Sequence, residues 1–176
     1  FDLFGYIAPG QSLIIFNDDP IVCLTLMALV TIGGLGFLVW EELARVRKFK
    51  QFSVYTKLVL LMTAGILLVG TCMILMLEWN NPGTLGNMPF WQKLMNAFFQ
   101  TGTLRTAGFV TVDQMALKDA TKVFSILIMF IGGSSGSTAG GLKTVTVLVL
   151  LLFVWAKARG KERVHVFKRN IPTIKA

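Results

Sequence analysis

The sequence predicts an all-α integral membrane protein, and three observations lead to that fold class. Hydrophobic residues make up 54% of the 176 residues, and the mean hydropathy is +0.67. Residues 21–40 and 58–77 are two runs without a charged side chain, each as long as the roughly 20 helical residues that cross a bilayer core. A third apolar tract, residues 123–156, is too long for one straight crossing at about 1.5 Å per residue.

Basic residues orient these helices, because Lys and Arg are retained on the cytoplasmic side of a membrane. Of the 17 basic residues, 12 lie in two clusters, one after the first apolar run and one after the third: Arg45, Arg47, Lys48, Lys50 and Lys57, then Lys157, Arg159, Lys161, Arg163, Lys168, Arg169 and Lys175. The first helix therefore runs inward, the second outward and the third inward, with the ends of the inner helices in the cytoplasm. The net charge of +8 then reflects topology and does not indicate nucleic-acid binding.

The segment between the second and third apolar runs must begin and end outside the membrane. It contains residues 89–99 (PFWQKLMNAFF), an apolar run with a proline at its start, where a helix tolerates one. Because this run is too short to span a bilayer, we predict a re-entrant pore helix there. The Thr/Gly segment TGTLRTAGF follows it at residues 101–109. Taken alone, the two pieces could equally be an interfacial helix and an extracellular turn.

The segment TGTLRTAGF has a composition suited to an ion filter. Irregular backbone at membrane depth is tolerated only where it is buried in protein or lines a water-filled cavity, and backbone carbonyls can replace the hydration shell of a cation. Glycine allows the chain to turn such carbonyls inward. Arg105 would repel a cation in the ion path, so this interpretation requires its side chain to point into the surrounding protein.

An internal repeat links the first and third apolar tracts. Both copies contain Ile-Gly-Gly, at residues 32–34 and 131–133, and Val-Trp, at residues 39–40 and 154–155. Between these marks the second copy is longer by 16 residues, so part of it is an insertion. Internal repeats are common in transporters, whose binding sites lie at the repeat interface.

The inserted sequence IGGSSGSTAGGLKT, which starts at residue 131, should interrupt the third helix. Each glycine costs about 1 kcal/mol of helix propensity relative to alanine, and the hydroxyls can bond the freed backbone groups. Lys143 is either a lysine that reaches the inner interface or an electrostatic barrier in a closed pore. The pattern Gly-x-Ser-x-Gly at residues 132–136 does not indicate a hydrolase, because its flanks are apolar and the one histidine, His165, lies in the basic tail.

The combination of TLRTAGF and IGGSSGSTAGGLKT resembles the third repeat of the Trk/Ktr/HKT potassium transporters, specifically the Ktr-type membrane subunit. The resemblance implies potassium-channel-like repeats around one pore, each with an outer helix, a re-entrant pore helix with a filter loop, and an inner helix. It makes the chain a fragment, in which residues 1–51 end repeat two, residues 52–160 form repeat three, and residues 161–176 form a cytoplasmic link to repeat four. The implied elements are an inner helix at 21–40, an outer helix at 58–78, a pore helix at 89–99, a filter at 103–109 and a broken inner helix at 122–156.

The same resemblance implies site residues, an ion and partners. The filter carbonyls belong to Leu104, Arg105, Thr106, Ala107 and Gly108. The intramembrane gate is the loop 132–141 together with one lysine: Gly132, Gly133, Ser134, Ser135, Gly136, Ser137, Thr138, Ala139, Gly140, Gly141 and Lys143. The transported ion is K+, with Na+ left open, and the resemblance implies no other metal, no organic cofactor and no enzymatic activity.

The expected partners are the lipid bilayer of the plasma membrane, a second copy of the subunit in a homodimer, and a KtrA-like cytosolic nucleotide-binding ring. The alternative is a non-conducting structural or signalling membrane protein in which the Gly/Ser loop is only a helix-packing kink.

Overall fold

The computed structural model describes residues 12–46, 48–159, 165–166 and 169–170. Its helices, in chain order, are the short 3-10 turn Ile14–Phe16, α1 Pro20–Leu35, α2 Phe37–Arg45, the 3-10 turn Phe49–Gln51, α3 Val54–Glu78, α4 Phe90–Thr103, α5 Asp119–Phe130 and α6 Thr144–Ala158. Two-residue strands, β1 His165–Val166 and β2 Arg169–Asn170, pair antiparallel near the C-terminus. The beginning of the first repeat copy and most of the predicted 161–176 link lie outside the described residues.

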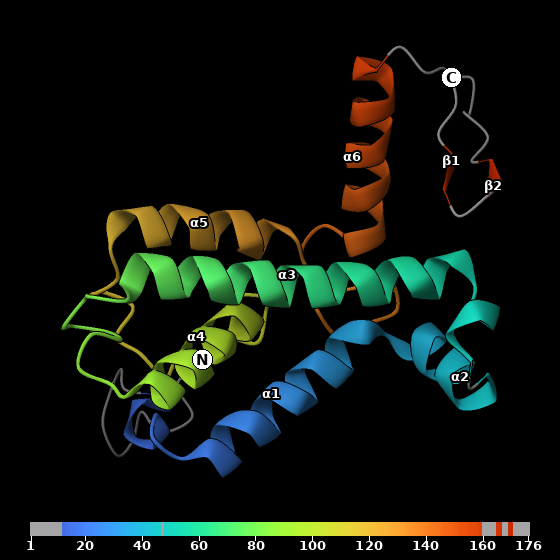
Figure 1. Cartoon of the computed structure of the whole chain (residues 1–176). Coiled ribbons are helices and arrows are strands. Elements are labelled where there is room, and N and C mark those ends of the chain that lie inside the picture. The colour runs from blue at the N-terminus through green and yellow to red at the C-terminus, as the bar shows by residue number, and fades with distance from the viewer. Residues whose placement is uncertain (1–11, 47, 160–164, 167–168, 171–176) are drawn as a thin grey trace.

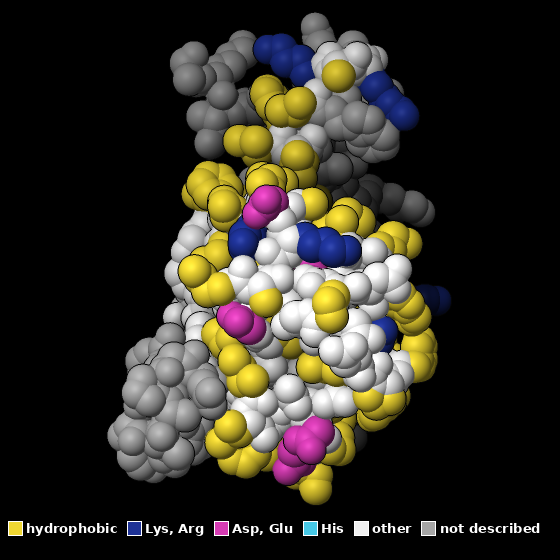
Figure 2. Space-filling view, turned by 90° about the vertical axis from the view of Figure 1, so that its left-hand side faces the viewer, with side chains coloured by type: hydrophobic (Ala, Val, Ile, Leu, Met, Phe, Trp, Pro, Cys, Tyr) yellow, Lys and Arg dark blue, Asp and Glu magenta, His cyan; other side chains and the backbone are white. Residues whose placement is uncertain are grey.

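Helix α3 is the centre of the fold, and the other helices pack around it. Figure 1 shows α5 along one side of α3 and α1 and α4 on the other, with α2 beside the first turns of α3. The C-terminal end of α3 lies near the start of α5, whereas the basic segment that follows α2 lies at the opposite end. Figure 2 shows the first of these ends as a face on which acidic and basic groups lie among hydrophobic side chains.

Helix α1 begins where its sequence indicates and ends earlier than expected. The Asp19 carboxylate caps it by accepting from the Ile21 and Val22 amides at 2.9 and 3.3 Å, and Pro20 occupies the first turn, where its missing amide costs nothing. The prediction of one helix over residues 21–40 is wrong, because α1 stops at Leu35 and α2 leaves at an angle of 94°.

The bend has a local cause at Gly36. Its φ is +81°, a left-handed conformation that other residues adopt only with strain. A Cβ at this position would lie 2.6 Å from the Ser134 hydroxyl and 2.8 Å from the Ser135 carbonyl oxygen. The distant Gly/Ser loop therefore packs directly against the bend, and the backbone there has to be glycine.

Helix α3 spans 25 residues and starts four residues before the predicted outer helix at 58–78. The Ser53 hydroxyl caps it by accepting from the Thr56 amide at 3.2 Å. Within the described residues, α3 is the one unbroken helix long and apolar enough to cross a membrane, while α1 and α2 meet that criterion only as a bent pair. Large apolar side chains on α3, including Leu68 and Met76, are exposed, as expected for a surface that lipid or further protein covers.

Helix α4 starts at Phe90, immediately after Pro89, and is longer than the predicted pore helix at 89–99. It continues to Thr103, which the prediction placed in the filter. Its last turn is buried, and the Thr101 hydroxyl bonds back to the Ala97 carbonyl at 2.9 Å. Burial and this intrahelical bond extend the helix beyond the apolar run. The apolar contacts that hold it come from α1 on one side and from α3 and α5 on the other.

The third apolar tract is broken by the Gly/Ser loop, which confirms the predicted interruption of the inner helix. Helix α5 ends at Phe130 and α6 begins at Thr144, so the loop comprises residues 131–143. Helix α6 then leaves the α3–α5 layer instead of continuing along α5 (Figure 1). Both copies of the sequence repeat therefore break near Ile-Gly-Gly. The first breaks at Gly36, two residues after the motif, and the second breaks at a long loop that begins with the motif.

Candidate functional site

The predicted filter segment follows the C-terminal end of α4 as a tight turn and a short extended stretch. The Leu104 amide donates to the Gln100 carbonyl at 3.3 Å, and the Ala107 amide donates to the Thr103 carbonyl at 3.1 Å. The Thr103 hydroxyl reaches across the turn and donates to the Phe109 carbonyl at 2.6 Å. Two residues of the turn have left-handed backbone, with φ of +72° at Thr106 and +80° at Gly108. The sequence TLRTAGF thus folds into a compact turn at the helix end.

The carbonyl oxygens of residues 104–107 accept no hydrogen bond from any described part of the chain. Backbone carbonyls in a folded protein are nearly always bonded, so four consecutive free ones call for another partner. They also follow the C-terminal end of α4, which carries the negative end of the helix dipole and favours cations. Chemically, this turn can supply oxygen ligands to a monovalent cation.

Arg105 has a buried side chain that is 7% exposed. Its Nη2 atom lies 3.5 Å from the Gly132 carbonyl oxygen at the start of the loop, and its Nε atom has no hydrogen-bond partner among the described residues. No carboxylate in the described part of the chain forms an ion pair with it. The guanidinium therefore lies inside the protein and is directed at the loop, the orientation that the filter interpretation requires.

The segment after the turn lies against the residues that precede α1. The Leu13 amide donates to the Val110 carbonyl at 2.8 Å, and the Val110 amide donates to the Ser12 hydroxyl at 3.2 Å. The chain just before α1 and the chain just after the predicted filter are consequently adjacent in space.

A row of amide side chains joins α4 to neighbouring segments, and the sequence analysis missed it. The Gln100 and Gln114 amides bond reciprocally at 2.8 and 3.1 Å, which ties α4 to the chain beyond the predicted filter. The Asn96 amide donates to the Asn17 carbonyl at 2.8 Å, and the Gln92 amide donates to the Asn17 side chain at 3.2 Å. The signal was present, because amides at 92, 96 and 100 recur every four residues on one face of an apolar helix.

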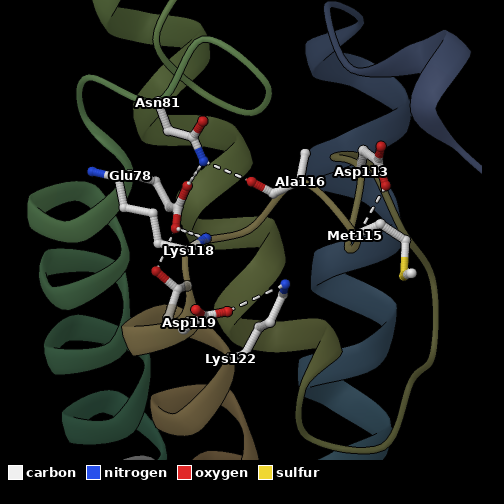
Figure 3. A network of polar contacts seen from close by, with 9 residues as sticks. Glu78, Asn81, Asp113, Met115, Ala116, Lys118, Asp119 and Lys122 are labelled. Carbon is white, nitrogen blue, oxygen red and sulfur yellow. Dashed lines mark hydrogen bonds and ion pairs between the residues drawn. The ribbon is translucent and has the colours of Figure 1, made fainter.

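Glu78 forms a second set of hydrogen bonds at the C-terminal end of α3, shown in Figure 3. Its side chain is fully buried, and its carboxylate accepts four hydrogen bonds. The donors are the Asn81 side-chain amide at 2.5 Å, the Thr84 hydroxyl at 2.7 Å, the Lys118 backbone amide at 3.0 Å and the Thr121 hydroxyl. One carboxylate thus joins α3, the 79–89 loop before α4, and the start of α5. By contrast, the nearby Asp119–Lys122 pair, at 3.6 Å, lies on the surface.

The Gly/Ser loop folds back so that its two ends lie side by side. Ile131 and Leu142 form a parallel bridge, in which the Gly132 amide donates to the Leu142 carbonyl at 3.0 Å. A Cβ on Gly132 would lie 1.6 Å from the Gly140 carbonyl oxygen, so glycine is required for this close approach. The Lys143 ammonium donates to the Ala139 carbonyl at 3.1 Å and closes the loop on itself.

The structure brings the predicted gate into contact with the predicted filter. Besides the Arg105 contact, the Gly140 amide donates to the Thr106 hydroxyl at 3.2 Å. On its other side the loop rests on the α1–α2 bend. The Ser134 amide donates to the Gly34 carbonyl at 3.1 Å, and its fully buried hydroxyl donates to the Leu35 carbonyl. Two motifs that the sequence separates by about thirty residues thus form one site.

Helix α2, which follows the bend, and the start of α3 also contact the loop, through residues that the sequence analysis did not single out. The Phe37 amide donates to the Gly136 carbonyl at 3.2 Å, and the Tyr55 hydroxyl donates to the Ser135 carbonyl at 3.0 Å. Glu42 lies beyond the apolar run, on the charged helix that the bend directs away from α1. Hydrogen bonds from the Ser53 hydroxyl and then the Thr56 hydroxyl lower the pKa of the Glu42 carboxyl.

No group of three or more His, Cys, Asp or Glu side chains in the described residues could hold a metal ion. The candidate ligands are therefore the backbone oxygens of the 104–107 turn, which suit a weakly held, partly dehydrated cation.

Comparisons with known proteins identify the family of the chain. The model of the TrkH family, described as a cation transport protein, matches residues 1–174. The chain is 39% identical over 97% of its length to the Ktr system potassium uptake protein B of Bacillus subtilis, and 36% identical over 95% of its length to the potassium/sodium uptake protein NtpJ of Enterococcus hirae. It spans 38% and 37% of those two proteins.

The fold is similar to that of the potassium transporter TrkH from Vibrio parahaemolyticus. The TM-score is 0.69 at 22% identity, over 85% of this chain and 31% of the other. The family match covers almost the whole chain, and it coincides with the two motifs that meet in the site. The chain belongs to the TrkH family of cation transport proteins.

Proposed function

We propose that this chain is part of the membrane-embedded, ion-translocating subunit of a potassium uptake system. In this proposal the carbonyls of residues 104–108 line one side of a selectivity filter, and the loop 132–141 is the gate. The observation that carries it is the turn after α4, where four carbonyl oxygens accept no hydrogen bond within the described chain. The relatives named for potassium uptake support the choice of ion.

The filter role follows from the energetics of a dehydrated cation. A cation that leaves water must regain ligands of comparable strength, and backbone carbonyls supply them without a full negative charge. The C-terminal end of α4 adds a partial negative charge next to the turn. Because the Arg105 guanidinium is buried toward the loop, its charge does not occupy the turn itself. K+ is the proposed ion, and the potassium/sodium name of one relative keeps Na+ as an alternative.

The gating role follows from the position of the loop against the turn. The loop contacts the filter segment through Thr106 and Arg105 and rests on the α1–α2 bend through Ser134. Glycine-rich backbone has little helical preference of its own, so these few contacts hold it in place. A displacement that breaks them would open the space next to the filter.

The proposed assembly is a multi-pass protein of the plasma membrane with four repeats around one pore. Residues 1–51 would end repeat two, 52–160 would form repeat three, and 161–176 would lead to repeat four. We further propose a homodimer that works with a cytosolic nucleotide-binding ring, and transport without a chemical step on the ion. The name of the Ktr system in the relatives supports a multi-component system.

The test is potassium uptake by cells that lack their own high-affinity systems and express the full-length subunit. Deletion of residues 134–140 should raise the flux and reduce its dependence on the cytosolic partner, while substitutions in the 104–108 turn should change the K+/Na+ flux ratio. Unchanged flux and unchanged selectivity in both folded variants would contradict the proposal and favour a helix-packing kink in a non-conducting protein.

A further inference from the structure

The loop contacts a structural unit that we call the α2–α3 base. It consists of α2, the Phe49–Gln51 turn and the first turn of α3. Glu42 of α2 joins its parts, because the carboxylate accepts from the Ser53 backbone amide, from the Ser53 hydroxyl at 2.7 Å and from the Thr56 hydroxyl. A buried apolar cluster that includes Val39 and Val59 packs the same two helices together. The base should therefore move as one piece.

Tyr55 connects this base to the loop. It lies in the first turn of α3, is half-buried, and its hydroxyl donates to the Ser135 carbonyl at 3.0 Å, across 80 residues of sequence. Among the described residues, this is the one side-chain hydrogen bond from the base to the loop. The adjacent backbone bond from Phe37 to Gly136 at 3.2 Å holds the same stretch of loop. The aromatic ring of Phe37 also packs so closely that a Cβ on Gly136 would lie 2.8 Å from it.

We propose that Tyr55 is a positioning residue of the gate, whose hydroxyl holds residues 134–136 in place and transmits movements of the α2–α3 base to the loop. This inference rests on the proposed gating function of the loop. A force on the base would act on the loop through Tyr55 and Phe37, while the filter side of the loop is held separately through Thr106 and Arg105. Ser134 holds the loop to the end of α1 as well, through the Gly34 and Leu35 carbonyls, and the Tyr55 bond can be altered without touching these contacts or those to Thr106 and Arg105.

The expected size of the effect follows from the bond that is lost. Tyr55→Phe removes only the donor to Ser135 and keeps the ring. Because the bond is made only while the loop is in place, its loss weakens the closed state and leaves the displaced state unchanged. A typical net hydrogen bond corresponds to a roughly two- to ten-fold change in such an equilibrium. The chain offers a matched control, because the buried Thr63 hydroxyl on the same helix has no hydrogen-bond partner in the described structure.

The experiment uses the full-length subunit in potassium-loaded liposomes without any cytosolic partner. Tyr55→Phe should raise the basal potassium flux roughly two- to ten-fold, and Thr63→Val should not. The K+/Na+ flux ratio of Tyr55→Phe should equal that of the wild type, because the 104–108 turn is untouched. A changed ratio would mean that the substitution disturbs the whole pore and would overturn the assignment of Tyr55 to the loop alone.

Deletion of residues 134–140, measured in parallel, separates this inference from the proposal beneath it. If the deletion raises the flux and Tyr55→Phe does not, the loop is the gate and the role of Tyr55 is wrong. If the deletion leaves the flux unchanged, the proposal that the loop is a gate is wrong. Should Tyr55→Phe fail to fold, Glu42→Ala provides a second test, because it removes the acceptor of the Ser53 amide and of the Ser53 and Thr56 hydroxyls and loosens the base. Wild-type flux in folded Glu42→Ala would then overturn the inference.

Discussion

The buried carboxylate of Glu78 should be the group at the C-terminal end of α3 whose substitution costs the most stability. Each of its oxygens accepts two hydrogen bonds: Oε1 from the Lys118 amide and the Thr121 hydroxyl, Oε2 from the Asn81 amide and the Thr84 hydroxyl. Glu78→Gln has the same shape but keeps an acceptor on one side only, and its NH2 group then faces two donors on the other.

The loss of unfolding free energy in Glu78→Gln can be worked out from these four hydrogen bonds. Hydrogen bonds to a charged group contribute about 1.5–3 kcal/mol each, and two are lost. A threonine hydroxyl can rotate to accept from the new amide and recover part of the loss, so we expect a destabilisation of about 2–4 kcal/mol. For domains of 150–250 residues, 1 kcal/mol shifts the unfolding midpoint by about 2–4 °C, which suggests a fall of several degrees for the full subunit in detergent.

The assay is thermal unfolding of the purified full-length subunit, with Asp119→Asn as the matched control. Asp119 lies at the same end and its side chain is fully exposed, with an ion pair to Lys122 at 3.6 Å (Figure 3). Neutralising it should leave the midpoint unchanged, because exposed pairs contribute little. Equal midpoints for the two variants would refute the reasoning that Glu78 holds α3, the 79–89 loop and α5 together.

Three further predictions concern the loop, α4 and the α2–α3 base. Gly36→Ala places a Cβ 2.8 Å from a loop carbonyl on left-handed backbone, so it should displace the loop and raise basal potassium flux, whereas Gly65→Ala, with open space around it, should not. A double-mutant cycle on the reciprocal Gln100–Gln114 pair should give a coupling of about 0.5–3 kcal/mol in unfolding, and additive effects would show that the amides do not act together. The lowered pKa of Glu42 means that its contribution to stability is complete above its ordinary value of 4.5 and is lost as the pH falls through the lowered value. The thermal unfolding midpoints of the wild type and Glu42→Gln should therefore converge at acid pH. A difference between the two midpoints that stays constant with pH would contradict this prediction.

Local sequence signals predicted much of the fold because they describe preferences that each segment carries by itself. The uncharged run in α3, Pro89 before α4, and the glycine-rich interruption at 131–143 all lie where those preferences predict. The element ends were less predictable. Helix α4 extends to Thr103 because its last turn is buried, and burial depends on neighbours that the run of residues 89–99 does not contain.

The candidate site was likewise predictable from the sequence only in part. Its two motifs were visible as unusual Thr/Gly and Gly/Ser stretches inside apolar sequence, and their family resemblance is confirmed by the match to the TrkH model. The assignment of individual filter and gate residues remains a prediction. Tyr55 and Glu78 could not be found, because each looks like an ordinary residue near a helix end, and its role depends on partners 80 and 43 residues away.

By itself, the sequence determined which segments are apolar enough to form membrane helices, which ends carry basic charge, and where the third apolar tract is interrupted. Only the tertiary structure decided that the loop packs against both the turn after α4 and the bend at Gly36. The physical reason is that hydropathy and helix propensity act over a few neighbouring residues. The left-handed conformation at Gly36, the burial of Arg105 and the bond from Tyr55 exist only because distant segments approach each other in the folded chain.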